Sequence, residues 1–196
     1  MSSGVVKVNP VSVRQYGAQA QSSFAEIHRQ LKELVDCVVE VRYKGPNAVN
    51  FKTKTGEIAA EFANQANRKM QEIATAVKSS TSNISTALGG QPIDIGVDSR
   101  TIAVPTVAPS DVVELDSSAL LELKSVVSRK FDEINVAFKA NYTSLCSTDW
   151  EGTAKNSATS TVKGITDSAN AAAHAAEQAI NKAIQAQIDA VEAADN

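Results

Sequence analysis

The sequence predicts an all-α protein, an antiparallel four-helix bundle formed by two tandem helix-turn-helix hairpins. Three observations predict this fold. The composition is rich in helix-forming residues, with 43% hydrophobic but only 5% aromatic residues. The chain repeats itself at an offset of 107 residues, and its apolar residues recur with a helical period. A chain of 196 residues has room for one large domain or two small ones.

The internal repeat needs no gap. An offset of 107 residues aligns Glu26/Glu133, Phe24/Phe131, Ile27/Ile134, Gly45/Gly152, Ile58/Ile165, Ala66/Ala173, Ile73/Ile180 and Ala76/Ala183 as identities. The aromatic residue two positions before each aligned glycine also matches, Tyr43 with Trp150. Because one offset serves both sides of this aromatic-x-Gly sequence, the chain is predicted to consist of one structural unit present twice.

Apolar residues recur at steps of three and four before each aromatic-x-Gly sequence. They stand at positions 13, 16, 20, 24, 27, 31, 35 and 38 in the first unit, and at 120, 123, 127, 131, 134, 138, 142 and 145 in the second. These steps give about 3.67 residues per turn, which is typical of nearly straight packed helices. The pattern resumes after each turn, at Ile58 and at Ile165. Each unit is therefore predicted to be a hairpin of two long helices.

The predicted organisation is a first hairpin over residues 1–88, a linker over 89–115 and a second hairpin over 116–196. Gly89 and Gly90 are expected to end the second helix, and Asp116 or Ser117 to cap the third. A helix of 30 residues is about 45 Å long, a distance that an extended linker of this length can cover. The hairpins can therefore pack antiparallel. Within the linker, "PIDIGVDSRTIAV" alternates like a strand and could bind along the bundle.

The formal net charge of -3 is unevenly distributed. Residues 1–90 carry 11 Lys and Arg against 7 Asp and Glu, a net charge of +4, whereas residues 91–196 carry 8 against 15, a net charge of -7. Complementary halves favour pairing of the two halves with each other, and hence a monomer, over pairing of identical halves between chains. No element concentrates Lys and Arg, so nucleic acid is not an expected partner.

The residues that could carry chemistry are few and scattered. His28 and His174 have no His or Cys three or four residues away and are expected to be solvated, and Cys37 and Cys146 are not expected to form a disulfide. No acid-base pair, cofactor loop or metal set is present, so the chain is predicted not to be an enzyme and to need no cofactor. The sequence also shows no cleavable export signal and no apolar run of membrane-spanning length.

Two helices joined by an aromatic-x-Gly turn resemble the WXG family of type VII secretion substrates, the early secretory antigenic target-like proteins. "DWEG" at Asp149–Gly152 matches the family turn, and "YKG" at Tyr43–Gly45 stands at the same place in the first unit. The two matches cover nearly the whole chain outside the linker. Family members form homodimers or heterodimers of two such hairpins, so the resemblance implies a heterodimer fused into one polypeptide.

The resemblance implies a non-enzymatic secreted effector or cargo adaptor that works through protein–protein interaction. Its partners would be a type VII export ATPase or other secretion components. Its location would be cytoplasmic before export, and extracellular or at the cell surface afterwards, without a cleaved signal peptide. The expected site is a composite patch of Trp150 or Tyr43 with the end of the opposing hairpin's second helix. Gly152 and Gly45 permit the turn, while the ring covers the bundle end and offers one polar atom to a partner.

Two other classes of function stay open. The family's export signal, Tyr-x-x-x-Asp/Glu, is absent, because Tyr16, Tyr43 and Tyr142 are followed four residues later by Ala20, Asn47 and Cys146. The same bundle could therefore be a helical scaffold or assembly protein, cytosolic or phage-type, that is never exported. The Ala-rich stretch Ala169–Ala186 also allows a membrane-disrupting protein, so contact with a membrane stays undecided.

Overall fold

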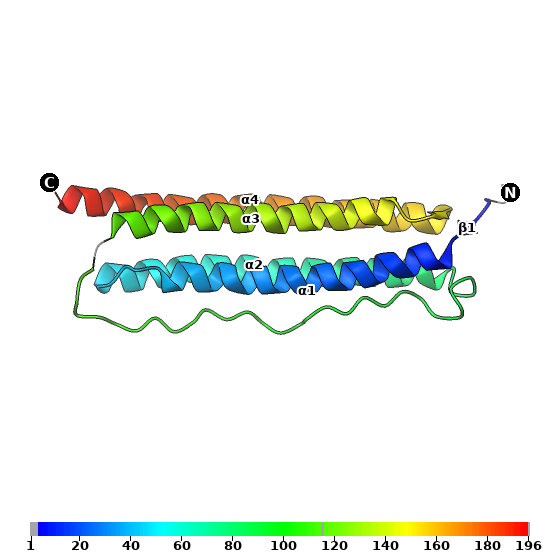
Figure 1. Ribbon diagram of the computed structural model, residues 1–196, viewed down its shortest axis with the longest axis horizontal. Helices are drawn as coiled ribbons and strands as arrows, with labels where there is room; N and C mark the ends of the chain where they lie inside the picture. The colour runs from blue at the N-terminus through cyan, green and yellow to red at the C-terminus, as the bar shows by residue number, and fades with distance from the viewer. Residues whose placement is uncertain (1–3, 115, 196) are drawn as a thin grey trace. The chain divides into compact units, whose positions relative to one another are not determined.

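The computed structural model describes residues 4–114 and 116–195, most of them in four long helices (Figure 1). The elements are β1 (Lys7–Val8), α1 (Pro10–Glu40), α2 (Pro46–Ser82), α3 (Ser117–Cys146), β2 (Trp150–Glu151) and α4 (Thr153–Ala194). The helices pack against each other as a four-helix bundle, which confirms the predicted all-α fold. Residues 1–3, Leu115 and Asn196, at the ends of the three predicted segments, lie outside the described residues.

The chain divides into two compact units, and each contains parts of both hairpins. Unit 1 consists of Met1–His28, Ala66–Ser99 and Val136–Asn170, and unit 2 of Arg29–Gln65, Arg100–Asn135 and Ala171–Asn196. Unit 1 therefore combines the open end of the first hairpin with the turn of the second, and unit 2 combines the opposite pair of ends. The antiparallel packing that the linker length predicts is found within each unit.

The first helix of each hairpin begins at a side-chain cap. Asn9 Oδ1 accepts a hydrogen bond from the backbone N–H of Val11 at 3.1 Å, at the start of α1. Asp116 Oδ1 accepts one from the N–H of Ala119 at 3.0 Å, at the start of α3, so Asp116 is the cap that the sequence predicts. Such caps satisfy N–H groups that have no partner inside the first turn.

The apolar positions predicted from the repeat form the core. All eight in α1 are buried, and so are seven of the eight in α3. The buried residues among them are Val13, Tyr16, Ala20, Phe24, Ile27, Leu31, Val35, Val38, Leu120, Leu123, Val127, Phe131, Ile134, Phe138 and Leu145. Each large apolar side chain stabilises the fold by about 1.5–3 kcal/mol when fully buried, so these two stripes are a main source of stability.

Helix α3 departs from the repeat at one position. Tyr142, predicted to be in the core, is only half-buried, and the neighbouring Asn141 is buried instead. The Tyr16 hydroxyl donates a hydrogen bond to Asn141 Oδ1 at 3.4 Å. This bond gives the buried amide one of the partners that a polar group needs inside a core.

Helix α2 ends earlier than predicted. Its last residue is Ser82, and the chain continues in turns to Gly89 and Gly90, whose φ angles are 84° and 92°. The Thr81 hydroxyl donates to a carbonyl one turn earlier at 2.7 Å and accepts the Ile93 N–H at 2.9 Å. Ser and Thr side chains compete in this way with the helix's own hydrogen bonds, which explains why the Ser- and Thr-rich end leaves the helix before the glycines.

The segment between the hairpins is an extended strap (residues 91–113) that packs on the first hairpin. In unit 1, Ile93 and Ile95 are buried while Asp94 between them is exposed, as the strand-like alternation predicts. Helix α1 makes room for the strap at Gly17, where an added Cβ would lie 2.6 Å from Ile93 Cγ2. Gln21 Oε1 accepts the Gly96 N–H at 3.0 Å, so polar side chains also hold the strap.

His28 is one of the residues that hold the strap in unit 1. Its Nε2 lies 3.5 Å from the Asp98 carboxylate, and its Nδ1 lies 3.1 Å from Asn67 Oδ1. Asn67 Nδ2 also donates to the Asp98 carbonyl at 2.6 Å. The prediction that His28 is a solvated surface residue is therefore wrong, because Asp98 and Asn67 are both distant in sequence and cover it. His174 is exposed as predicted.

In unit 2 the strap is held by a side-chain amide and a second glycine. Asn64 Oδ1 accepts the Ile102 N–H, and Asn64 Nδ2 donates to the Ile102 carbonyl, both at 2.9 Å. An added Cβ at Gly56 would lie 2.8 Å from Val104 Cγ1. The repeat aligns these two positions with Ala171 and Lys163. At these two positions the second hairpin therefore lacks the residues that hold the strap in the first.

Two helical glycines make a matched pair for testing how tightly the strap is seated. Alanine in place of a helical glycine normally raises the free energy of unfolding by about 0.5–1 kcal/mol. At Gly164 an added Cβ meets nothing within 4 Å, so Gly164→Ala is expected to show this gain. At Gly56 the contact with Val104 forces the strap to shift, so Gly56→Ala is expected to show none. Urea unfolding measures both, and equal gains would contradict the tight contact.

The two cysteines are free thiols, as predicted, and differ in exposure. Burial raises the pKa of the Cys37 thiol to about 11 from its usual 9.0, whereas Cys146 is exposed. Because the thiolate is the reactive form, Cys37 is expected to react with iodoacetamide at pH 8 about 100-fold more slowly than an unperturbed thiol. Timed labelling with peptide mapping measures both rates, and equal rates would contradict the burial of Cys37. The unfolded chain releases this proton first, so stability is expected to fall between pH 9 and 11.

Candidate interaction site at the two turns

The turn of the second hairpin lies in unit 1 and joins α3 to α4. Trp150 is 1% exposed, and Gly152 has a φ of 128°, a conformation that glycine adopts without strain. Lys155 Nζ donates to the carbonyls of Cys146 at 2.8 Å and Thr148 at 2.6 Å. The bond to Cys146 satisfies a carbonyl at the end of α3 that has no partner inside the helix, and the bond to Thr148 holds the turn that follows.

The turn of the first hairpin lies in unit 2 and has the same plan. Tyr43 is 3% exposed, and Gly45 has a φ of 117°. The Tyr43 ring packs edge-on against Phe51, with ring centroids 6.0 Å apart and planes at 63°. Its hydroxyl donates to Gln187 Oε1, near the end of α4, at 2.7 Å. The structure therefore brings Tyr43 together with the end of the opposing hairpin's second helix.

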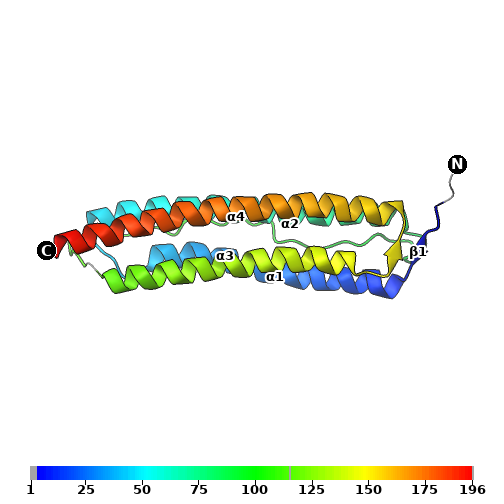
Figure 2. The same ribbon diagram turned by 90° about the horizontal axis from the view of Figure 1, so that it is seen from above.

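Each turn is paired with the residues that precede the first helix of the other hairpin. In unit 1, β1 and β2 form a two-stranded antiparallel sheet in which Lys7 faces Glu151 and Val8 faces Trp150 (Figure 2). In unit 2, Lys44 and Glu114 form an isolated antiparallel bridge. Antiparallel backbone pairing thus holds both turns in place.

The pairing segments are themselves part of the repeat. The offset of 107 residues aligns Val5, Val6, Lys7 and Asn9 with Val112, Val113, Glu114 and Asp116. Val6 lies against Gly152 and Val113 against Gly45, with contacts of 3.4 Å and 3.3 Å to a Cβ added at each glycine. The sequence repeat therefore begins at residue 5, before the first helix. An extension of the alignment across the helix starts could have found these residues.

The two turn pairings carry their charges in opposite places. The turn supplies the acidic residue in unit 1 and the basic residue in unit 2. Lys7 faces Glu151 in unit 1, whereas in unit 2 Lys44 Nζ lies 2.8 Å from Glu114 Oε2. The hydrogen bond from Lys44 holds the pKa of the Glu114 carboxyl below its usual value. Both groups are largely exposed, so the pair adds little stability. Opposite charges of this kind mainly favour pairing of each turn with its own partner segment over pairing with the other segment.

The two rings differ in how their polar atoms are satisfied. Tyr43 has Gln187 as a hydrogen-bond partner, whereas the buried Trp150 Nε1 has no acceptor among the described residues. The repeat aligns Gln187 with Ser80, at the end of α2. In the second turn the shorter Ser80 side chain thus stands at the position from which Gln187 accepts the Tyr43 hydrogen bond in the first turn.

A groove of about 440 Å³ lies beside Tyr43 in unit 2, between α2 and α4. It is lined by Asn47, Asn50, Phe51, Lys54, Thr55, Ala183, Ala186, Gln187 and Ala190. The lining combines three alanines and an aromatic ring with amide groups, a threonine and one lysine. A lining that combines apolar and polar groups is typical of surfaces that bind a protein segment.

The predicted site residues are thus placed in two clusters, one in each unit. Trp150 and Gly152 lie in unit 1, and Tyr43 and Gly45 lie in unit 2. Both rings are buried, so neither is presented on the surface as a contact residue. The accessible part of the composite patch is the groove that Gln187 shares with the start of α2. Sequence reasoning missed Gln187, Asn47 and Asn50, which carry no motif.

Within residues 4–114 and 116–195, no group of three or more His, Cys, Asp or Glu side chains could hold a metal ion. No helix in the same part of the chain is long and apolar enough to cross a membrane. The fold and the two turns define a four-helix bundle of two hairpins, in which each turn pairs with the segment before the other hairpin's first helix. No protein-family model, curated protein or solved structure matches the chain.

Proposed function

We propose that this chain is a non-enzymatic type VII secretion substrate in which two hairpins that the family pairs as separate chains are fused into one. It would act outside the cell as an effector or cargo adaptor. The observation that carries the proposal is the reciprocal fastening of the turns: each aromatic-x-Gly turn pairs with the segment before the other hairpin's first helix. A pseudo-heterodimer with two equivalent turn ends has this arrangement.

The groove beside Tyr43 is the surface we assign to recognition by the export ATPase or another secretion component. In the family, the export signal lies near the end of a second helix, next to the partner's turn. In this chain Gln187 occupies that place, held by the Tyr43 hydroxyl at 2.7 Å. Asn47, Asn50 and Lys54 add polar groups from α2 to the lining of the groove. A recognition surface built from both hairpins can replace a linear signal.

The absence of Tyr-x-x-x-Asp/Glu favours a second candidate, a helical scaffold or assembly protein that stays inside the cell. The two candidates differ in a single observable, the presence of the native protein in the culture medium. The experiment compares untagged protein in the medium of a native host with that of the same host lacking the export ATPase. Export that depends on the ATPase supports the proposal, and retention in both hosts favours the scaffold.

A matched pair of variants tests the groove itself. Ala186 is exposed and lines the groove, and the repeat aligns it with Ser79, which is exposed on α2 outside the groove. Ala186→Arg is expected to lower export about tenfold, which corresponds to 1.4 kcal/mol of lost binding. Ser79→Arg is expected to leave export unchanged. Equal export of both variants, with unchanged helical circular dichroism, would show that the groove is not the recognition surface.

A further inference from the structure

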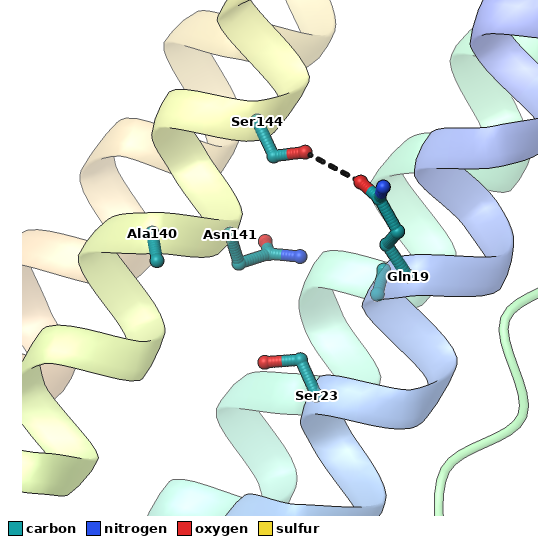
Figure 3. Close-up of a pocket in the computed structure, with 6 residues that line it drawn as sticks. Gln19, Ser23, Ala140, Asn141 and Ser144 are labelled. Atoms are coloured by element: carbon teal, nitrogen blue, oxygen red, sulfur yellow. Dashed lines mark hydrogen bonds between the residues drawn. The ribbon is translucent and has the colours of Figure 1, made fainter.

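A small pocket of about 220 Å³ lies in unit 1 between α1 and α3 (Figure 3). It is lined by Gln19, Ala20, Ser23, Ala140, Asn141 and Ser144, none of which is charged. Small-molecule and cofactor sites usually enclose about 300–1,000 Å³. The pocket is therefore suited to a single side chain or a fragment of similar size.

The repeat shows why the pocket exists. It aligns Ser23 with Lys130 and Ala140 with Glu33. In unit 2, Lys130 Nζ lies 2.6 Å from Glu33 Oε2, and the Lys130 side chain is only 16% exposed. This ion pair occupies the place where unit 1 has a hydroxyl and a methyl group. The pocket thus results from two small residues that replace a lysine and a glutamate.

Asn141 forms the inner wall of the pocket. It is 4% exposed, and the repeat aligns it with the fully buried Leu34. Tyr16 donates to Asn141 Oδ1, whereas Asn141 Nδ2 has no acceptor among the described residues. Figure 3 shows the Asn141 amide pointing from α3 towards α1, into the space between Gln19 and Ser23. A buried donor gains from an acceptor, so this N–H group is the part of the pocket that an acceptor group of a ligand would bind.

The orientation of the amide is held from behind by Tyr16. Burial raises the pKa of Tyr16 to about 12, so its hydroxyl stays protonated and donates to Asn141 Oδ1. The donor end of the amide is thereby left facing the pocket. On the opposite side, the Ser144 hydroxyl donates to Gln19 Oε1 at 3.3 Å.

The polarity of the lining selects the chemical class of the partner. A carboxylate or ammonium group would lose its hydration without meeting an opposite charge, which is unfavourable. A carboxamide fits better, because its carbonyl can accept from Asn141 Nδ2 and its amino group can donate to the Ser23 hydroxyl. Ala20 and Ala140 offer apolar contacts to the methylene groups behind it.

We propose that this pocket binds the carboxamide side chain of an Asn or Gln residue in a partner polypeptide. The site is distinct from the groove beside Tyr43, and the proposal does not depend on export of the chain. Its test therefore uses purified full-length protein alone.

The probe is N-acetyl-glutamine methylamide, with N-acetyl-glutamate methylamide as the charged counterpart. The expected result is a saturable shift of the Asn141 side-chain NH₂ resonances in ¹⁵N NMR, with a Kd of about 1–10 mM for the amide, as suits so small a group. The glutamate probe is expected to bind at least about tenfold more weakly, since its charge is not compensated. No saturation with the amide would leave water as the occupant, and equal shifts with both probes would show that the pocket does not select a carboxamide; either result would overturn the proposal.

Two sets of variants separate binding from folding. Ser23→Lys combined with Ala140→Glu copies the ion pair of unit 2 and is expected to abolish the shift while the helical circular dichroism is kept. Lys130→Ser combined with Glu33→Ala opens the equivalent place in unit 2, where Leu34 offers no donor. This second variant is expected to gain no binding at the Leu34 position. Binding retained after the pocket is filled would show that the resonances report another site.

Discussion

Replacement of Trp150 by alanine is expected to lower the free energy of unfolding by about 3–5 kcal/mol, the usual cost of removing a large buried ring. Trp150 is among the largest fully buried side chains, and it lies at the turn that β1 fastens. The change leaves a cavity beneath the β1–β2 pair as well as lost apolar contacts. Urea unfolding followed by circular dichroism measures the effect. A loss below about 1 kcal/mol would show that the ring is not part of the core.

Trp150→Phe is the matched control. It keeps most of the apolar ring and removes only the indole N–H, which has no acceptor among the described residues. Its expected cost is about 1–2 kcal/mol, from the smaller ring alone. The same variant separates stability from recognition. If Trp150→Phe is stable but is not exported, export also requires the indole group, and the groove beside Tyr43 is not sufficient.

The helices and their inward faces could be predicted from the sequence, because they depend on local periodicity. The steps of three and four placed fifteen of sixteen positions of α1 and α3 correctly in the core. The exception is Tyr142, which is only half-buried although the pattern predicts it in the core. The neighbouring Asn141 is buried. Asn141 stands where the first unit has the buried Leu34, and Tyr16, 125 positions away, supplies one of its hydrogen-bond partners.

The strap and its binding residues could be predicted only in part. Alternation in "PIDIGVDSRTIAV" indicated an extended segment with one apolar edge, and Ile93 and Ile95 lie buried as that pattern requires. Its binding site could not be predicted, because Gly17, Gly56 and Asn64 look ordinary within helical sequence. A helical glycine can be recognised as a contact position for the strap only when a distant side chain is found in the space that its Cβ would occupy.

The sequence predicted the two turns of the candidate site, but not which residues form its accessible surface. The aromatic-x-Gly sequences located both turns, and Gly45 and Gly152 have the positive φ angles that such turns need. The sequence did not show that both rings are buried, so that the accessible surface consists of their neighbours. Gln187 is 144 positions from Tyr43, and no local pattern joins them.

Replacement of Asn64 by alanine is expected to release the part of the strap that lies in unit 2. Asn64 exchanges two hydrogen bonds of 2.9 Å with the backbone of Ile102, whose side chain is buried. Loss of both bonds leaves a backbone N–H and a carbonyl without these partners, at a cost of about 2–3 kcal/mol. Hydrogen exchange of the Ile102 amide is expected to accelerate about 30–150-fold as a result.

The neighbouring Gln65→Ala is the control for this prediction, because Gln65 bonds only weakly to Glu61 of the same helix, at 3.5 Å. It is expected to leave exchange of the Ile102 amide unchanged. The Ile93 amide, held by Thr81 in unit 1, reports how far the release extends. If Asn64→Ala accelerates Ile102 alone, the two parts of the strap detach separately. If exchange at Ile102 is unaffected, the buried apolar edge holds the strap without the amide, and Asn64 is not its anchor.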